Sequence, residues 1–380
     1  MTTLLRGRVI TPEADLDDAV VVIEGDSIAA VRPPAHGDPE RTDHVLLPGL
    51  VDGHCHGGGG ASFTVGDGDQ VAAAAGHHLG QGTTSPVGSA VTDSPERMVA
   101  AISALADGVE AGLLAGVHSE GPFLSRARCG AQDPAYLREP DLGLATELVD
   151  AGRGHLRVMT VAPELPGAVR LAELLAEHGV VAAVGHTEAD AATTERFLRT
   201  TFLRTTEPGL VTHLFNGMPP LHHRSPGPVG GALTAAADGA ARVELIADGV
   251  HLADDTVRTM YAVLGADRIL LVTDAMAAAG MPDGDYQLGP QRVRVVDGTA
   301  RLAEGDSIAG GTTRLLDVVR RLVGAGLDPV SVVASASLVP AAALGLDRVG
   351  ALRAGLRADL VVTDGDLRPL RVMRSGEWVR

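Results

Sequence analysis

The chain between Leu46 and Met276 alternates between two patterns of hydrophobic and polar residues. Short runs rich in apolar and β-branched residues are followed by longer stretches whose apolar residues recur at helical spacing. Strands that are apolar throughout are typical of a parallel sheet covered by helices on both faces. Eight such runs predict a closed (β/α)8 barrel of the TIM type over residues 48–348. In chain order they are LVDGHCH, TTSPVGSAV, LLAGVHSEG, LRVMTVAPE, VVAAVGHTE, LVTHLFNGM, VELIADGVH and RILLVTDAM.

The two ends of the chain carry a different pattern. Residues 1–47 contain short strand-like pieces separated by Gly, Pro and Asp, and residues 349–380 repeat this arrangement without a long helical stretch. Neither end has enough strands to bury a face of its own. We therefore expect both ends to combine into one small β-sandwich domain beside the barrel.

Residues of metal-binding type stand at the carboxyl ends of most predicted strands, where the active sites of such barrels form. His54 and His56 end the first strand, and because alternate residues share a face, both imidazoles point the same way while Cys55 points away. The glycines that follow them let the chain turn sharply away from a crowded site. The other strands end with Glu120, His186, His213, His251 and Asp274.

Imidazole and carboxylate groups together favour a divalent transition metal, zinc first, with iron, manganese or cobalt as alternatives. Glu120 is able to bridge a first ion held by His54 and His56 and a second held by His186 and His213, as carboxylates do in two-metal hydrolases. We expect one or two ions per subunit, with Asp274 among their ligands. The barrel is thus predicted to be that of a metal-dependent hydrolase. Asp274 is then placed to take a proton from the attacking water and to return it to the leaving group.

The composition of the chain limits which binding partners and which cellular location we expect for the protein. The formal net charge of −17 at pH 7 repels polyanions, so we expect neither nucleic acid nor a membrane surface as a partner. The two cysteines cannot form a disulfide framework for a chain of 380 residues, and no apolar run approaches the roughly 18 residues of a membrane span. A cytoplasmic protein is expected.

Several motifs of the sequence resemble, in order and spacing, those of the N-acetylglucosamine-6-phosphate deacetylases, which belong to the amidohydrolase superfamily. The motifs are HCH after LPGLVDG, SEGPF, APE, GHT, THLFNGM, ADGVH and VTDAMAAAG, and GLRADLVVTD near the carboxyl end. The resemblance covers nearly the whole chain. It implies metal-dependent hydrolysis of the acetamide of N-acetylglucosamine 6-phosphate to glucosamine 6-phosphate and acetate, in amino-sugar catabolism and the recycling of cell-wall sugars.

The resemblance also implies roles for the residues at strand ends. Asp274 stands at the position of the family's general base and acid. Glu120, His186 and His213 stand at the positions that hold the metal always present, and His251 at the position that contacts the sugar and the reacting carbonyl. The catalytic pair implied in this way is Asp274 and His251.

Further implied roles concern the substrate phosphate. Asn216 and Gly217 match a pair that holds the phosphate, together with an arginine that matches Arg224. In the family that arginine can come from the neighbouring subunit, so the resemblance implies a homodimer in which Arg224 reaches the neighbouring active site.

The chain departs from the family pattern at two places. Some members use one metal and carry Gln-x-Asn where this chain has His54 and His56. For this chain, two metals therefore stay an alternative to one. In the loop after the third strand, Gln132 stands where the family has a histidine near the substrate. We therefore count Gln132 as a substrate-binding candidate whose contact with the sugar or acetyl group differs.

Other residues are expected to support the site rather than to react. His118 shares a strand face with Glu120, and we interpret it as a buried support rather than a ligand. His77 and His78 lie in a helical stretch away from any predicted strand end and are expected to be packing or surface residues. Cys129 lies in a predicted lid loop, where a single cysteine is usually a bystander.

Three other functions fit parts of the pattern. Cyclic-amide hydrolases on this scaffold need a carboxylated Lys, and the chain contains no Lys. A purine or pyrimidine deaminase uses similar histidines and a final Asp, but the stretch from Asn216 to Arg224 suits a phosphorylated sugar better, and 2% aromatic residues offer few stacking surfaces. A metal-binding scaffold without turnover has no use for an acid or base at Asp274.

Overall fold

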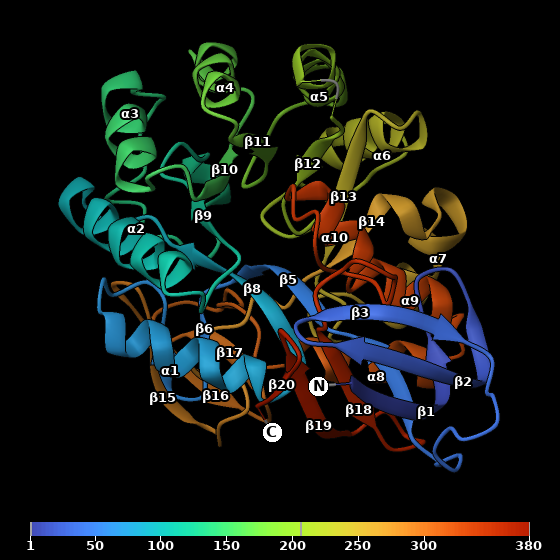
Figure 1. Ribbon diagram of the computed structural model, residues 1–380. Coiled ribbons are helices and arrows are strands. Elements are labelled where there is room, and N and C mark those ends of the chain that lie inside the picture. Colours follow the sequence, from blue (N-terminus) through green and yellow to red (C-terminus); the bar gives the residue numbers. More distant parts are fainter. Residues whose placement is uncertain (1, 206, 380) are drawn as a thin grey trace.

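The computed structural model describes residues 2–205 and 207–379 of the chain. Among them, eight parallel strands form one sheet in chain order, and helices lie outside it (Figure 1). The predicted (β/α)8 barrel is therefore confirmed, and each of the eight predicted runs overlaps one strand, although β12 and β13 begin one and two residues before their runs. The strands are β5 (Leu50–Cys55), β8 (Thr83–Ala90), β9 (Gly116–Glu120), β10 (Leu156–Val161), β11 (Val181–Val184), β12 (Gly209–Val211), β13 (Ala241–Leu245) and β14 (Ile269–Leu271).

The helices of the barrel cover its outside in an arc that is clear for α2 to α7 in Figure 1. Ser94 caps α2 by accepting a hydrogen bond from the backbone of Arg97, and Pro95 occupies the first turn, where its missing N–H costs nothing. The helices are α1 (Gly68–Leu79), α2 (Pro95–Glu110), α3 (Leu142–Ala151), α4 (Ala168–Glu177), α5 (Ala191–Thr205), α6 (Gly227–Ala237), α7 (Asp254–Leu264), α8 (Leu315–Gly324), α9 (Pro329–Ser335) and α10 (Leu338–Ala343), with short 3-10 turns at Arg126–Arg128 and Ala266–Arg268.

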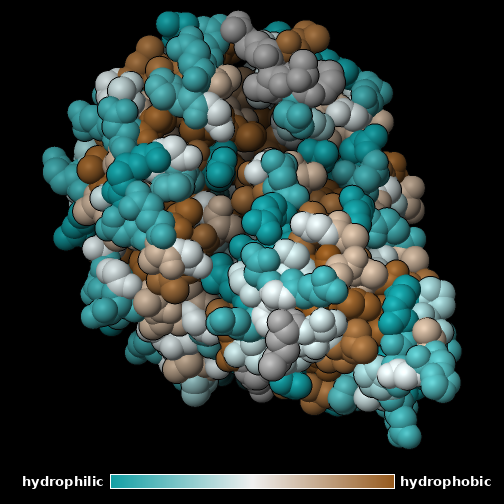
Figure 2. All heavy atoms as spheres, viewed as in Figure 1, coloured by the Kyte–Doolittle hydropathy of each residue, from teal (hydrophilic) through white to brown (hydrophobic). Residues whose placement is uncertain are grey.

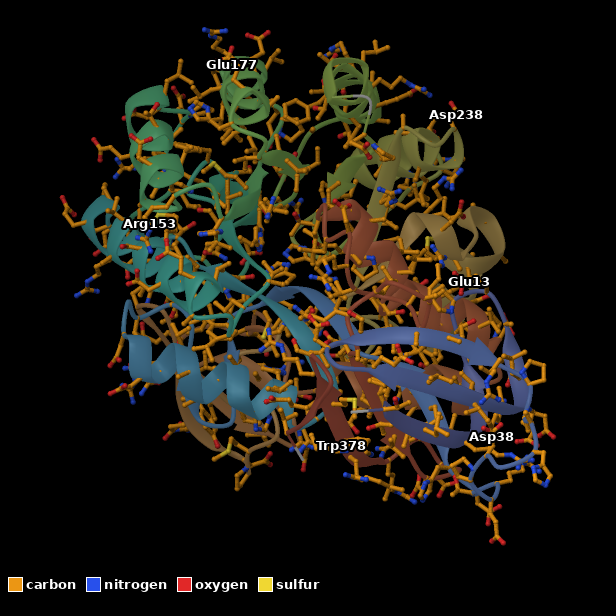
Figure 3. All side chains as sticks on the ribbon, in the orientation of Figure 1. Glu13, Asp38, Arg153, Glu177, Asp238 and Trp378 are labelled. Carbon is orange, nitrogen blue, oxygen red and sulfur yellow. The ribbon has the colours of Figure 1, made fainter. Side chains whose placement is uncertain are left out.

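Charged side chains lie on the outer side of these helices. Arg153, Glu177 and Asp238, which follow or end α3, α4 and α6, point outward in Figure 3. The face of the molecule in Figure 2 mixes hydrophilic and hydrophobic residues. None of the described helices is long and apolar enough to cross a membrane.

The barrel closes where its first and last strands meet. Beyond β14, the backbone N–H of Asp274 donates to His54 O at 2.9 Å, and His56 N–H donates to Ala275 O at 2.7 Å. Asp52, fully buried on β5, accepts from Thr273 Oγ1 at 2.6 Å and from Thr273 N at 3.2 Å. The contacts that close the barrel thus lie next to the candidate ligands.

Asp52→Ala is expected to lower the free energy of unfolding by about 1–3 kcal/mol, because it leaves the buried donors of Thr273 without their acceptor. The change is measured by urea unfolding against Asp107→Ala, which removes a surface ion pair with Arg153 and is expected to cost less than about 0.5 kcal/mol. Equal unfolding midpoints for the two variants would mean that Asp52 does not hold the seam.

The interior of the barrel changes from apolar to polar along the strands. Since every second residue faces inward, Val87 is followed by Ser89 and Val158 by Thr160 on the same face. The apolar residues pack together with Val339 and Leu344 at α10, whereas the polar ones lie nearer the carboxyl ends. A hydrophobic core thus supports a polar layer beneath the candidate site.

The two ends of the chain join in one sheet of seven strands, in the order β20-β19-β18-β4-β1-β2-β3. One face packs around its own core, which includes Val21 and Leu360, and the other contributes Leu47 and Val361 to the main core of the barrel. A bridge between Ser27 and Arg357 joins the edge strand β3 to the segment that precedes β18. The strands are β1 (Thr2–Ile10), β2 (Asp15–Glu24), β3 (Ser27–Arg32), β4 (Val45–Pro48), β18 (Leu360–Thr363), β19 (Pro369–Arg374) and β20 (Glu377–Trp378).

A small antiparallel sheet between β14 and α8 was not predicted. It consists of β15 (Gly284–Leu288), β16 (Gln291–Val296) and β17 (Thr299–Leu302). The alternation in β16 buries Val293 and Val295 against Met276 and leaves Arg292 and Arg294 exposed. Leu288 at the end of β15 and Ile308 after β17 line the same pocket as Asp274.

Candidate metal centre and active site

His54 and His56 lie at and just beyond the end of β5, and both imidazoles are buried and point to the same place, as predicted. Their Nε2 atoms are 3.1 Å apart. The glycines behind them form a hairpin, β6 (Gly57–Gly58) with β7 (Ala61–Ser62), and a Cβ on Gly57 would lie 2.3 Å from Ala61 O. Glycine is thus required for the turn that follows the two histidines.

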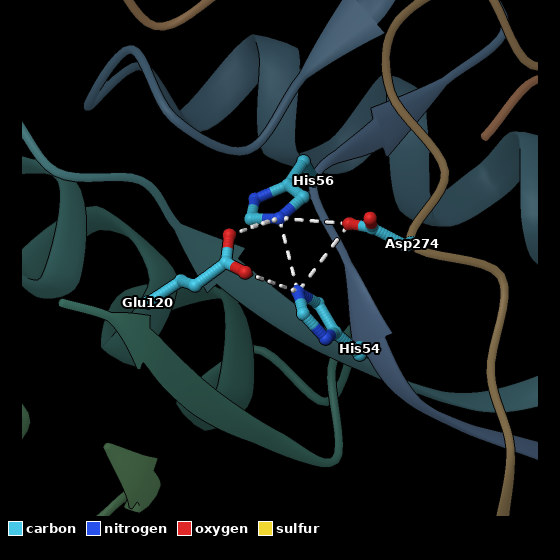
Figure 4. A group of neighbouring side chains, drawn as sticks. All are labelled: His54, His56, Glu120 and Asp274. Carbon is cyan, nitrogen blue, oxygen red and sulfur yellow. Dashed lines mark hydrogen bonds and ion pairs between the residues drawn. The ribbon is translucent and has the colours of Figure 1, made fainter. Parts of the chain in front are cut away.

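Glu120, at the end of β9, joins two groups of side chains. One oxygen, Oε2, is 3.1 Å from His56 Nε2, and the other, Oε1, is 3.7 Å from His54 Nε2. Asp274 Oδ1 approaches the same histidines from the opposite side, at 3.1 Å from His56 Nε2 and 3.4 Å from His54 Nε2. Figure 4 shows these four side chains converging on one point.

The second group shares Glu120 with the first. Glu120 Oε1 is 2.9 Å from His213 Nε2 and 3.0 Å from His186 Nε2, and these two nitrogens are 3.2 Å apart. The ligand atoms of each group lie within 4.8 Å of one another. The structure therefore brings together all six residues that the sequence predicted as metal ligands, with Glu120 between the two predicted histidine pairs, and it places Asp274, which was assigned to neither pair, beside His54 and His56.

The outer nitrogens of these imidazoles show where the protons are. His54 Nδ1 lies 3.2 Å from Glu244 Oε2, His56 Nδ1 lies 3.0 Å from Ser89 O, and His186 Nδ1 lies 2.7 Å from Arg128 O. Carbonyl and carboxylate oxygens only accept, so each Nδ1 carries a hydrogen, and Nε2 is the nitrogen that is left to bind an ion at the centre. Lone pairs and carboxylates that face one another across about 3 Å are the arrangement that a divalent cation needs.

The charges of the bare site point the same way. Burial works against the charged forms, but the neighbouring carboxylates outweigh it and raise the pKa of His56 to about 9. Burial likewise opposes ionisation of Asp274, yet His54 and His56 lower its pKa to about 2. Glu120 behaves in the same way, and its pKa lies well below its ordinary value. The site thus holds two carboxylates that are ionised at neutral pH and attract positive charge.

Three of these residues adopt a backbone conformation that is uncommon outside glycine. The φ angles of His186, His213 and Asp274 are 47°, 30° and 48°. Each lies two or three residues beyond its strand, where the chain turns out of the barrel wall. Such conformations cost of order 1–3 kcal/mol each and persist where the surrounding contacts require them, which is common at functional sites.

His251 also reaches the site, but the prediction that it ends the seventh strand is wrong. Strand β13 stops at Leu245, and a turn built on Asp248 carries His251 to the pocket. Asp248 Oδ1 accepts from the backbone N–H groups of Val250 and His251, and Oδ2 lies 2.8 Å from His251 Nδ1. Sequence reasoning missed Asp248, although Asp before Gly is a turn signal.

Gln132 lines the pocket, but both ends of its amide are already used. Its Nε2 donates to Glu120 Oε2 at 2.6 Å, and its Oε1 accepts from Thr92 N at 2.8 Å. The side chain is 4% exposed. Gln132 therefore fixes the orientation of Glu120, and its substrate-binding role stays a prediction.

The pocket above the two groups has a volume of about 310 Å³. Asn216 and Gly217 line it as predicted, and a Cβ on Gly217 would lie 2.9 Å from His186 Nδ1. Arg224 does not line this pocket; it is exposed and its Nη1 lies 2.8 Å from His223 Nε2. Further lining residues that the sequence did not suggest are Gly130, Ala131, Phe215, Leu288, Ser307, Ile308 and Gly310.

Comparison with known proteins agrees with this geometry. The sequence profile of the amidohydrolase family matches residues 45–379. The chain belongs to the amidohydrolase family.

Named relatives cover almost the whole of this amidohydrolase. It is 35% identical over 384 residues to the N-acetylgalactosamine-6-phosphate deacetylase of Escherichia coli O157:H7, covering 99% of both chains. It is 36% identical over 360 residues to the human N-acetylglucosamine-6-phosphate deacetylase, covering 90% of this chain and 85% of that protein. The crystal structure of N-acetyl-D-glucosamine-6-phosphate deacetylase from Mycobacterium smegmatis superimposes with a TM-score of 0.92 and 41% identity over 100% of both chains.

Two histidines outside the ligand set support the site of this amidohydrolase. His118 has both nitrogens engaged, with Ser89 Oγ at 3.0 Å and Thr160 Oγ1 at 2.8 Å, which agrees with a supporting role. His78 is fully buried and its Nε2 lies 2.9 Å from Gly57 O. The expectation that His78 is remote from any strand end is therefore wrong, because α1 packs against the glycine hairpin that follows His56.

Proposed function

We propose that the protein is a metal-dependent deacetylase that hydrolyses the acetamide of N-acetylglucosamine 6-phosphate to glucosamine 6-phosphate and acetate. The observation that carries the proposal is Glu120, shared between two pairs of histidines, with Asp274 facing it at the base of a pocket. The names of the relatives support the reaction and the class of substrate.

One or two divalent ions would be held by the two groups, His54, His56, Glu120 and Asp274 in one and Glu120, His186 and His213 in the other. Imidazole and carboxylate ligands favour zinc, with iron, manganese or cobalt as alternatives. A bound ion supplies a polarised carbonyl and a water that ionises near neutral pH.

Asp274 is the residue that moves the proton. Its pKa of about 2 keeps it ionised at neutral pH, so it is able to accept the proton of the attacking water. The same carboxyl then returns that proton to the nitrogen of the departing amino sugar. The C–N bond of the acetamide breaks, and acetate and a free amine result.

His251 is proposed to donate a hydrogen bond to the acetamide oxygen. Its Nδ1 hydrogen is bound to Asp248, so Nε2 carries a hydrogen only in the imidazolium form. Burial disfavours that form, but the hydrogen bond with Asp248 outweighs it, and the pKa of His251 is raised. The charged donor therefore persists to higher pH than an ordinary histidine.

Asp248→Asn is expected to move the alkaline limb of the kcat/KM profile to lower pH. The variant removes the anion that raises the pKa of His251 and leaves the burial that lowers it, so the imidazolium is lost at a lower pH. The measurement is kcat/KM against pH with the metal content checked at each point. A profile that coincides with the wild type would remove the charged His251 from the mechanism.

The substrate phosphate needs a cation that the described lining of the pocket does not provide, since it contains no arginine. We propose that Asn216 and Gly217 bind the phosphate from this chain and that Arg224 of a second copy completes the site in a homodimer. The exposure of Arg224 is compatible with this arrangement. A cytoplasmic location remains an expectation from composition.

The function is tested by acetate release from N-acetylglucosamine, N-acetylgalactosamine and N-acetylmannosamine, each with and without a 6-phosphate and a chelator. We expect rapid release from the phosphorylated gluco compound and none after chelation. A faster galacto reaction, as the name of the E. coli relative suggests for that protein, would change the assigned sugar. Ammonia release would favour a deaminase, and equal rates without phosphate would remove the role of Arg224.

A further inference from the structure

Another buried carboxylate, Glu244, lies behind the candidate ligands and has no role in the chemistry described above. It stands on β13, its side chain is about 1% exposed, and it does not line the pocket. Among the described residues, Glu244 forms one ion pair, and its partner is His54. A carboxylate so deeply buried requires a compensating partner, which makes its contacts informative.

One oxygen of Glu244 connects two sides of the barrel. Oε2 lies 3.2 Å from His54 Nδ1 on β5 and accepts from the backbone N–H of His213 at 3.1 Å, beyond β12. The backbone carbonyl of Glu244 accepts from Leu214 N–H at 2.9 Å. The Glu244 carboxylate therefore contacts the side chain of His54, whereas it contacts His213 only at the backbone N–H of that histidine.

We propose that Glu244 is a positioning residue that keeps His54 in the tautomer with Nε2 free and thereby controls metal loading at His54, His56, Glu120 and Asp274. The proposal rests on the proposed function only in requiring that metal binds there. Glu244 touches no substrate and is not itself a ligand.

The neighbours of His54 explain why one contact decides its state. The edge of the His118 ring packs against it at a centroid distance of 4.5 Å, and the His213 ring stacks on it at 5.5 Å, so the ring cannot rotate freely. What remains open is which nitrogen carries the hydrogen. A hydrogen on Nε2 would point at His56 Nε2, only 3.1 Å away, and would occupy the place of the ion.

The other group does not depend on Glu244 in the same way. His186 is oriented by Arg128 O, and among the described residues the Nδ1 of His213 has no hydrogen-bond partner. Loss of the Glu244 carboxylate is therefore expected to weaken the ion at His54 and His56 more than the ion at His186 and His213, where only a backbone hydrogen bond of His213 is lost. A residue with a merely structural role would affect both ions together.

The test uses Glu244→Gln and Glu244→Ala on the full chain, titrated with zinc against a competing chelator. Both variants are expected to bind the zinc at His54 and His56 about 10- to 100-fold more weakly, with alanine the weaker, and to keep the zinc at His186 and His213. Asp248→Asn is the matched control, because it removes a carboxylate four residues away that orients His251, and it is expected to bind zinc like the wild type.

A spectroscopic signature tests the same claim in the metal-free protein at alkaline pH, where the imidazole of His54 is neutral and exists as one tautomer or the other. With ¹⁵N-labelled histidine, the long-range imidazole correlations of His54 should report Nδ1–H in the wild type and a population of Nε2–H in both Glu244 variants. Unchanged zinc titrations, equal weakening of both ions or an unchanged tautomer would each overturn the proposal. These results are independent of deacetylation, so wild-type protein that binds zinc but releases no acetate would contradict only the proposed function.

Discussion

Asp274→Asn is expected to lower kcat by about two to four decades while the metal content stays that of the wild type. The amide oxygen of asparagine can still face His56 and His54, which lie 3.1 and 3.4 Å from Asp274 Oδ1. An amide, however, cannot take up the proton of water at neutral pH. The two effects are read separately, from acetate release under saturating substrate and from metal analysis of the same sample.

The matched control is Asp107→Asn on the outer face of α2, which is expected to leave kcat unchanged. Near-normal turnover in Asp274→Asn would refute the proton-transfer role. Loss of both metal and turnover would mean that Asp274 acts chiefly as a ligand.

The grouping of the candidate ligands could be predicted because it depends on strand geometry, which repeats along the sequence. Residues that are two positions apart on a strand point to the same face, so the side chains of His54 and His56 had to converge. Parallel strands end at one rim, so Glu120, His186, His213 and Asp274 had to come near them once the barrel was inferred. The eight-strand pattern and the rim chemistry support each other.

The groups that orient these ligands could not be predicted, because each contact joins distant parts of the chain. His54 and Glu244 are 190 residues apart, and nothing near either residue signals the pairing. Gln132 was predicted to bind substrate because it stands where the family has a histidine, and its hydrogen bonds to Glu120 and Thr92 could not be read from that resemblance. Identity at one position does not determine which atom lies 3 Å away.

The position of His251 was missed for a local reason. The apolar run that contains β13 continues past Leu245, so the strand appeared to extend toward His251. In the structure the Asp248 carboxylate accepts two hydrogen bonds from backbone N–H groups, and the turn that they form brings His251 to the pocket. Side-chain hydrogen bonding to the backbone overrides hydrophobic patterning at such points.

Barrel closure and assembly of the site depend on the same contacts in this fold. Asp52 accepts a hydrogen bond from Thr273. His54, two residues after Asp52, and Asp274, one residue after Thr273, are hydrogen-bonded through their backbones across the same seam. Whatever brings β5 to β14 also brings the first histidine pair to the proton-transfer residue. A seam variant such as Asp52→Ala is therefore expected to loosen the metal together with the fold.

Glu120→Ala is expected to empty both groups of metal. Glu120 Oε1 serves His186 and His213 at 3.0 and 2.9 Å, and Oε2 serves His56 at 3.1 Å, so no other described side chain belongs to both groups. Without it, His186 and His213 are two neutral ligands, fewer than zinc sites in proteins employ. The first group loses one of its two negative charges, and turnover should fall with the metal.

Metal analysis after gel filtration decides this prediction, with Glu110→Ala, a change at the exposed end of α2, as the control that keeps the ions. Glu120→Gln should fall between the two, because an amide oxygen remains a ligand but carries no charge and cannot bridge ions equally well. Unchanged metal content in Glu120→Ala would show that the bridging assignment is wrong. Loss of one ion alone would show that Asp274 and the first histidine pair hold their ion without the shared carboxylate.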